Sequence, residues 1–275
     1  MIDDALMAAA EQAVRDAAAA EVMPRWRRLA EDEVTAKSGP HDLVTVADQR
    51  AEAYLGAELT ALLPGSVVVG EEGVHARPAG YAALSGDAPV WIIDPVDGTR
   101  QFVRGEEGFA TMVALAHHGE TLAAWVYAPA QGPKGRMATA RRRGGALLDG
   151  EALAAGSPAP GAVLEVAVSH PDFTDPAQEE ALRGLRTEGV RTRPTGSAGL
   201  EYLAVASGAL DAVAYTWEAA WDHAAGLLLV AEAGGASCTL AGEPFRLAGG
   251  NALPLTAARD ARTARRMVGL LRDGN

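Results

Sequence analysis

The most constraining feature of the sequence is a short apolar run that ends in a turn carrying two carboxylates. Residues 90–93, Val-Trp-Ile-Ile, have the pattern of a buried strand, and Pro95 then removes a backbone donor, so we expect the strand to stop there. Gly98 can adopt a backbone conformation that residues with a side chain resist, which lets the chain turn. The turn therefore places Asp94 and Asp97 together at one strand end.

Two acidic groups at the mouth of a buried strand repel each other unless cations lie between them. Oxygen ligands of this kind suit Mg²⁺, which binds a few carboxylates and completes its shell with waters and substrate phosphate. The same residues also fit a simpler structure, in which an acidic turn leads into a helix capped by Thr99. Acidic residues elsewhere in the chain must decide between a metal site and an acidic turn.

Composition limits the class of protein. The chain has 275 residues, 48% of them hydrophobic, which is enough for one large or two ordinary domains with a sizeable core. A formal net charge of −12 argues against nucleic-acid or acidic-membrane partners but not against phosphate substrates, because bound metals reverse the local charge. The first residues lack a basic leader segment, no apolar run reaches membrane length, and the single cysteine, Cys238, fits a reducing compartment. We therefore expect a cytoplasmic protein.

Hydrophobic periodicity gives the two halves of the chain different characters. The predicted elements are helices over 2–23, 48–63, 177–184, 198–207 and 222–233, strands over 66–70, 90–93, 163–168 and 211–215, a hairpin of 109–116 with 121–127, and a loop over 73–88. The first half is typical of helices packed on a mostly antiparallel sheet, and the second of α/β alternation. We expect two lobes, residues 1–150 and 151–275.

Acidic residues stand at the ends of predicted elements in four separate places: Asp48, Glu71, the Asp94/Asp97 pair and Asp222. Taken singly, each has a structural explanation. Asp48 and Asp222 suit helix N-caps, and Glu71 suits a solvated turn. One of these residues alone therefore identifies no site.

Taken together, the motifs around these acids resemble those of the inositol monophosphatase-like family of metal-dependent phosphatases. The matching segments, in the family's order, are Asp42-Leu43-Val44-Thr45 with Asp48, Gly70-Glu71-Glu72, Trp91 through Thr99, and Trp221-Asp222-His223-Ala224-Ala225-Gly226 through Glu232-Ala233-Gly234-Gly235. The resemblance implies a layered α/β/α/β/α sandwich of the sugar-phosphatase type, with the active site between two lobes. It also implies a phosphoric monoester hydrolase that is a homodimer and is inhibited by lithium.

The resemblance also implies a role for each acid. The implied metal ligands are Glu71, Asp94, the backbone carbonyl of Val96, Asp97 and Asp222, which would hold two Mg²⁺ ions, with a third near Glu71 and Asp48 and with Mn²⁺ as a substitute. A water oriented by Glu71 and Thr99 would then attack phosphorus, because a cation lowers the pKa of that water. Asp48 would assist through Thr99 as the base.

Helix starts supply the candidate substrate contacts, because their free amides bind anions. These candidates are Gly98, Thr99, Gly196, Ser197 and Ala198, although Ser197 also suits a helix N-cap. Lys37 stands where the family carries a lysine in a loop, and it also fits a surface position.

Two places depart from the family's pattern. The family's inositol-reading glutamate corresponds here to Tyr215, which can still bond a hydroxyl, and Glu218 could replace that glutamate only in a rearranged loop. After Thr99, the family has Asn-Phe and this chain has Arg100-Gln101-Phe102. Inositol phosphate is therefore weakly supported as the substrate, because losing a polar partner alters selectivity.

We therefore expect a Mg²⁺-dependent phosphomonoesterase acting on a small hydroxylated metabolite phosphate. Related enzymes act on inositol 1-phosphate, histidinol phosphate, fructose 1,6-bisphosphate and 3′-phosphoadenosine 5′-phosphate. A haloacid-dehalogenase-type phosphatase is an alternative, but its D-x-D-G-T aspartates are two apart, whereas Asp94 and Asp97 are three apart. A non-catalytic regulatory protein on the same scaffold is another alternative, and the complete set of acids argues against it.

Overall fold

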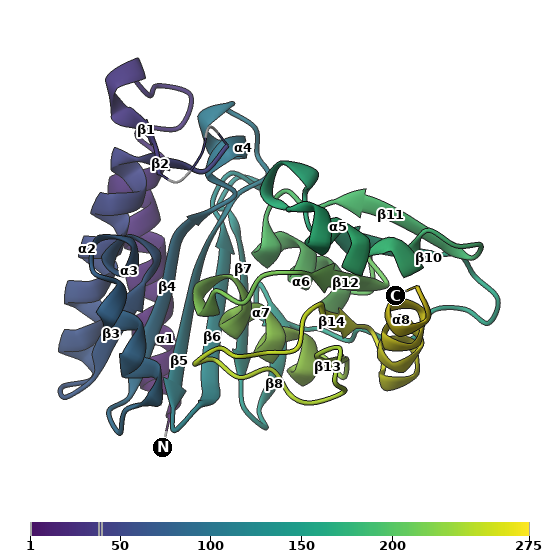
Figure 1. The fold of residues 1–275 in the computed structure, drawn as a ribbon. Coiled ribbons are helices and arrows are strands. Elements are labelled where there is room, and N and C mark those ends of the chain that lie inside the picture. The colour runs from purple at the N-terminus through teal and green to yellow at the C-terminus, as the bar shows by residue number, and fades with distance from the viewer. Residues whose placement is uncertain (1, 38, 40, 275) are drawn as a thin grey trace.

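Two β-sheets of seven and five strands alternate with three layers of helices in the structure, a computed structural model that describes residues 2–37, 39 and 41–274 (Figure 1). A third, two-stranded sheet pairs residues 34–36 with residues 43–45. The helices are α1 (Asp4–Ala17), α2 (Val46–Leu62), α3 (Glu71–Ala76), α4 (Thr99–Val103), α5 (Pro176–Ala181), α6 (Ala198–Ala206), α7 (Ala220–Glu232) and α8 (Ala261–Asp273). The strands are β1 (Val34–Ala36), β2 (Leu43–Thr45), β3 (Val67–Gly70), β4 (Val90–Asp97), β5 (Ala110–His117), β6 (Glu120–Ala128), β7 (Arg136–Arg141), β8 (Gly145–Leu148), β9 (Glu151–Ala152), β10 (Leu164–Val168), β11 (Val190–Pro194), β12 (Ala212–Tyr215), β13 (Ala236–Cys238) and β14 (Leu255–Ala258). The layers run from α1 and α2 through the larger sheet, α6 with α7 and the smaller sheet to α8, which confirms the predicted α/β/α/β/α sandwich.

The larger sheet has the strand order β3-β4-β5-β6-β7-β8-β9, in which β3 pairs parallel with β4 and the other neighbours pair antiparallel. Successive side chains of a strand point to opposite faces. In β4, Trp91 and Ile93 therefore pack toward α1 and α2, whereas Val90 and Ile92 pack toward α6 and α7. Burial on both faces explains why residues 90–93 are all apolar rather than alternating with polar residues. The predicted hairpin is present as β5 and β6.

The smaller sheet has the order β11-β10-β12-β14-β13 and mixes parallel with antiparallel pairs. Its inner face packs on α6 and α7, and its outer face packs on α8 and the short helical turn Arg183–Leu185. The helices α6 and α7 also contact the larger sheet, so one apolar layer joins both sheets. Within the described residues, none of the helices combines the length and apolar character that a membrane span requires.

The central strand does not stop at Pro95, as the sequence predicted, but continues to Asp97. Its register with β5 shifts between Asp94 and Asp97, which marks a β-bulge. Pro95 lies in that bulge, where a missing amide donor breaks no ladder hydrogen bond. Gly98 then has φ of 89°, as predicted for the turn, and a Cβ there would lie 2.9 Å from the backbone oxygen of Gly108.

Other helix boundaries also differ from the prediction. Residues 73–88 are largely helical, because α3 begins at Glu71 and a 3₁₀ segment spans Pro78–Ser85. Asp48 is not the N-cap of α2, because Thr45 holds that position and Asp48 completes a capping box three residues later. Asp222 likewise lies inside the first turn of α7 rather than at its cap. Both carboxylates are thus placed by the helix but remain free to point toward other elements.

Candidate active site

A cavity of about 290 Å³ lies where the end of β4 meets α4 and the first turns of α6 and α7. All five predicted metal-binding positions line it: Glu71, Asp94, Val96, Asp97 and Asp222. The predicted substrate contacts Gly98, Thr99, Gly196 and Ala198 line it as well. The fold therefore gathers acids from both halves of the chain around one space.

Three of the acids form a tight group, in which the carboxylate oxygens of Asp94, Asp97 and Asp222 lie within 4.8 Å of one another. Burial raises the pKa of Asp94 well above its usual value, and the charges of Glu71 and Asp97 raise it further. Burial and the charge of Asp97 raise the pKa of Asp222 to about 7. A cation in the group would offset this repulsion, which makes the group suitable as a metal site.

Asp97 is held by the first turn of α6. Its carboxylate accepts hydrogen bonds from the amides of Ala198 (3.0 Å) and Gly199 (2.7 Å) and from the Ser197 hydroxyl. These donors lower the pKa of Asp97, but burial outweighs them and raises it to about 6. Ser197 also caps α6 by accepting from the amide of Leu200, so the N-cap alternative for this residue is confirmed. The hydrogen-bonding groups of Ser197 and Ala198 are thus already engaged by a protein carboxylate.

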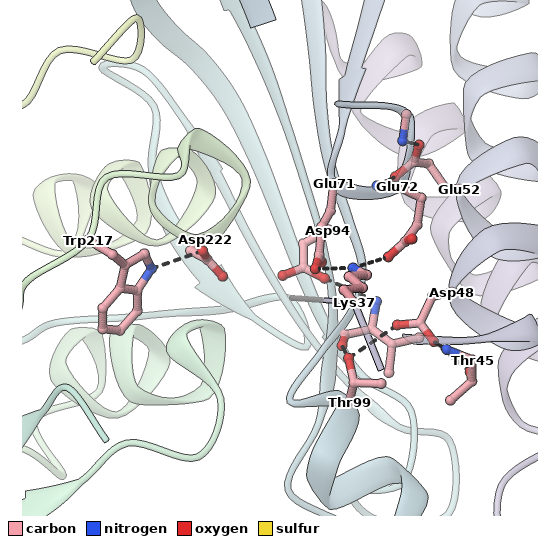
Figure 2. Close-up of polar contacts among 12 residues, drawn as sticks. Lys37, Thr45, Asp48, Glu52, Glu71, Glu72, Asp94, Thr99, Trp217 and Asp222 are labelled. Carbon is pink, nitrogen blue, oxygen red and sulfur yellow. Dashed lines mark hydrogen bonds and ion pairs between the residues drawn. The ribbon is translucent and has the colours of Figure 1, made fainter. Parts of the chain in front are cut away.

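Glu71 is held by a lysine instead. The ammonium group of Lys37 lies 2.6 Å from a carboxylate oxygen of Glu71 and 2.6 Å from one of Glu72, and its side chain is 4% exposed (Figure 2). Burial lowers the pKa of Lys37, but the two carboxylates outweigh burial and raise it. Burial raises the pKa of Glu71 to about 8, despite the favourable charge of Lys37. Lys37 is therefore an interior residue of the site rather than a surface lysine.

Asp48 reaches the cavity only through Thr99. One oxygen of the buried Asp48 carboxylate accepts from the amide (2.8 Å) and hydroxyl (2.5 Å) of Thr45, and the other lies 3.2 Å from the Thr99 hydroxyl (Figure 2). The same Thr99 hydroxyl lies 2.9 Å from the carbonyl of Val96. A hydroxyl has one proton to donate, so Thr99 can serve one of these acceptors at a time. Burial raises the pKa of Asp48 to about 6.

The structure does not bring Tyr215 or Glu218 to the cavity. Tyr215 is fully buried, its ring packs 4.3 Å from that of Trp217, and its hydroxyl lies 3.2 Å from the Thr195 hydroxyl. Glu218 accepts hydrogen bonds from the backbone amide (2.8 Å) and side-chain amide (2.9 Å) of Asn251. Both predicted substrate contacts are therefore engaged elsewhere, because the loop after β12 turns Glu218 away.

Two further residues shape the site: Trp217, which the sequence placed near the site and which lines the cavity, and Glu52, which the sequence did not single out. The Trp217 indole donates to Asp222 (2.9 Å), so this ring positions an acid of the cluster. Glu52 accepts from the amides of Glu72 and Gly73, each at 2.7 Å, and so fixes the first turn of α3 (Figure 2). The spacing of Glu52, four residues after Asp48 on the buried face of α2, was a signal for its inward position.

Comparisons with known proteins agree with this geometry. The model of the inositol monophosphatase family matches residues 3–269. The chain is 32% identical over 240 residues to inositol-1-monophosphatase of Bacillus subtilis, with 82% of this chain and 86% of that protein covered. It is 34% identical over 219 residues to fructose-1,6-bisphosphatase/inositol-1-monophosphatase of Thermotoga maritima, with 78% and 77% covered. The crystal structure of extragenic suppressor protein suhB from Bartonella henselae has a TM-score of 0.79 at 25% identity, with 99% and 100% covered. The chain therefore belongs to the inositol monophosphatase family and is a phosphoric monoester hydrolase.

Proposed function

We propose that the protein hydrolyses the monoester of a small hydroxylated metabolite with two or three Mg²⁺ ions, or Mn²⁺, in the cavity. The observation that carries this proposal is the group of Asp94, Asp97 and Asp222, whose oxygens lie within 4.8 Å of one another at the edge of a cavity. The family is metal-dependent. The residues that line the cavity fit a hard cation, because their potential ligand atoms are carboxylate and carbonyl oxygens. Glu71, Asp94, Val96, Asp97 and Asp222 are the proposed ligands.

The proposed mechanism depends on the Thr99 hydroxyl and the carboxylates around it. Divalent cations bound here supply positive charge to the phosphate and lower the pKa of a water. When Thr99 donates to Asp48, the lone pairs of its hydroxyl can accept a hydrogen bond from the attacking water. Asp48 can then take up a proton passed through Thr99, because burial raises its pKa to about 6. Glu71, which also lines the cavity, would help to orient the same water.

The backbone at the start of α4 is the proposed phosphate contact. Gly98 and Thr99 line the cavity directly behind Asp97, and the left-handed conformation of Gly98 brings the chain close to α6. Gly196 lines the cavity beside Gly98, because a Cβ on Gly98 would lie 3.4 Å from the backbone oxygen of Gly196. These positions replace Tyr215 and Glu218 as the groups nearest to a bound ester.

The test is phosphate release from a panel of metabolite monoesters with Mg²⁺, repeated with Asp94→Asn. We expect the variant to lose more than about 100-fold in kcat/KM, because disturbing even the partners of metal ligands costs 10- to 100-fold. Asp149→Asn is the control, because Asp149 forms an exposed ion pair with Arg136 far from the cavity. Equal activity of Asp94→Asn and wild type would refute the metal role, and a trapped aspartyl-phosphate would favour the haloacid-dehalogenase-type chemistry instead.

The panel contains the esters that the relatives' names mention, inositol 1-phosphate and fructose 1,6-bisphosphate, with histidinol phosphate and 3′-phosphoadenosine 5′-phosphate. We also propose a cytoplasmic homodimer that lithium inhibits and that binds no nucleic acid, on the basis of the family resemblance and the net charge of −12. Light scattering tests the dimer, and initial rates with and without LiCl test the inhibition.

A further inference from the structure

The end of the cavity away from the acidic group carries an arginine and two histidines. Arg100, His41 and His170 line the cavity there, beside the exposed ring of Phe173. They converge on the carboxylate of Asp172, whose Oδ2 lies 2.6 Å from Nη1 of Arg100, 3.8 Å from Nδ1 of His41 and 3.6 Å from Nδ1 of His170. Arg100 thus forms the ion pair with Asp172, whereas Nδ1 of His170 accepts a hydrogen bond from the Asp172 amide (3.1 Å) and leaves Nε2 of that ring as a possible donor.

The guanidinium of Arg100 is held in place but incompletely bonded. Its side chain is only 10% exposed, and its carbon lies 5.2 Å from the centre of the Phe173 ring. Its Nε atom is buried and has no hydrogen-bond partner in the part of the chain that the structure describes. A buried donor without a partner is unfavourable, whereas a carboxylate or phosphate could bind Nε and an Nη atom together. The arrangement therefore favours an incoming anion over Asp172 alone.

The position of Arg100 relates this cluster to the catalytic end. Arg100 follows Thr99 in α4, so the same short helix contributes to both ends of the cavity. Asp172 and Phe173 come from the segment between β10 and α5, which lies beside α4 (Figure 1). Asp172 is partly exposed, so a ligand from solvent can replace it without opening the core. A substrate could thus place its ester at the acids and a second group at Arg100.

We propose that Arg100, with His41 and His170, forms a second anion subsite that selects phosphate monoesters bearing a second acidic group. This inference rests on the proposed phosphatase function. The subsite distinguishes a bisphosphate or a phosphorylated acid from a neutral polyol phosphate.

The test uses two esters that differ in one group. 2-Phosphoglycerate and glycerol 2-phosphate carry the same secondary phosphate ester, but the first has a carboxylate where the second has a hydroxymethyl group. Glucose 1,6-bisphosphate and glucose 1-phosphate repeat the comparison with a longer spacing. We expect wild type to prefer the doubly acidic member of at least one pair by about 10-fold or more in kcat/KM, the range of a charge-assisted hydrogen bond.

Arg100→Gln is expected to reduce kcat/KM for the preferred doubly acidic ester by about 10- to 100-fold. The kcat/KM for the singly acidic ester of the same pair should change by less than about 3-fold. Arg183→Gln removes the same charge from an exposed position outside the cavity lining and should alter neither value. Asp172→Asn removes the competing carboxylate and should lower the KM of the doubly acidic ester. Thermal unfolding of each variant separates these effects from loss of the fold.

The outcomes separate this inference from the function on which it rests. Two results would overturn the subsite while leaving the phosphatase function intact. One is hydrolysis of the singly and doubly acidic esters at equal rates by the wild type. The other is an equal loss of kcat/KM for both esters of a pair in Arg100→Gln. Hydrolysis of none of the esters in the presence of Mg²⁺ would instead refute the proposed function.

Discussion

On the side of the larger sheet, Glu71 faces the ammonium group of Lys37, whereas on the side of α6, Asp97 faces backbone amides and the Ser197 hydroxyl. Both carboxylates belong to the same cavity. The amides of α6 are fixed by the helix and stay in place whatever the cavity contains. Lys37 is a full charge on a long side chain, and it competes directly with any cation for Glu71. The Asp97 side of the site is thus held by fixed backbone donors, whereas the Glu71 side is held by a side-chain cation that a bound metal ion would have to displace or accommodate.

The largest expected effect comes from removing the lysine. Lys37→Met leaves the partly buried Glu71 and Glu72 without their cation, so the metal-free protein should lose about 3 kcal/mol of unfolding free energy near pH 8. Saturating Mg²⁺ should restore most of this loss, because it supplies charge beside Glu71. Urea unfolding with and without Mg²⁺ measures both values. The control Arg183→Met breaks an exposed pair with Glu180 and should change stability by less than about 0.5 kcal/mol. If Mg²⁺ does not reduce the loss of unfolding free energy in Lys37→Met, Lys37 and the metal ion do not compete for Glu71.

A second test varies pH without a mutation. The pKa values of Glu71 and Asp222 are raised to about 8 and about 7, so between pH 6.5 and 8 the folded state binds more protons than the unfolded state. The metal-free protein should therefore lose roughly 2 kcal/mol of stability as the pH rises through this window. Below pH 6.5 the slope should persist, because the pKa values of Asp48 and Asp97 are raised to about 6 and these carboxyl groups then also bind protons in the folded state. His223, whose pKa burial lowers to about 4, has the opposite effect but offsets only one of these groups.

The measurement is urea unfolding at pH 6.5, 7.2 and 8.0, in EDTA and again in saturating Mg²⁺. Bound cations favour the charged carboxylates, so the slope should largely disappear when Mg²⁺ is present. Stability that rises across the window in EDTA would show that the acids are not the groups that titrate.

The smallest expected effect comes from the α6 side. Ser197→Ala removes the helix N-cap and one hydrogen bond to Asp97, so we expect a loss of about 1 kcal/mol. Because the amides of Ala198 and Gly199 remain, this loss should be the same with and without Mg²⁺, unlike that of Lys37→Met. Ser207→Ala, at the other end of the same helix, is the matched control. A loss that Mg²⁺ reverses would remove the contrast between the two sides.

The sequence by itself determined the elements whose causes are local. The hairpin of β5 and β6, the strand entering Asp94 and the left-handed Gly98 follow from periodicity and backbone sterics within a few residues. The family motifs also identified the acids that line the cavity. The prediction that the strand stops at Pro95 was wrong. Pro95 lies in a β-bulge, where its missing amide donor breaks no hydrogen bond between strands, and a bulge depends on the neighbouring strand.

Only the tertiary structure decided which partner each acid receives. Lys37 and Glu71 are 34 residues apart, Asp97 and Gly199 are 102 apart, and Arg100 and Asp172 are 72 apart in sequence. No local pattern encodes such pairs, because each joins residues from separate elements that only the packing of the layers brings together. The same packing buried Tyr215 and turned Glu218 toward Asn251, so the residues at the mouth of the cavity became visible only when the layers were assembled.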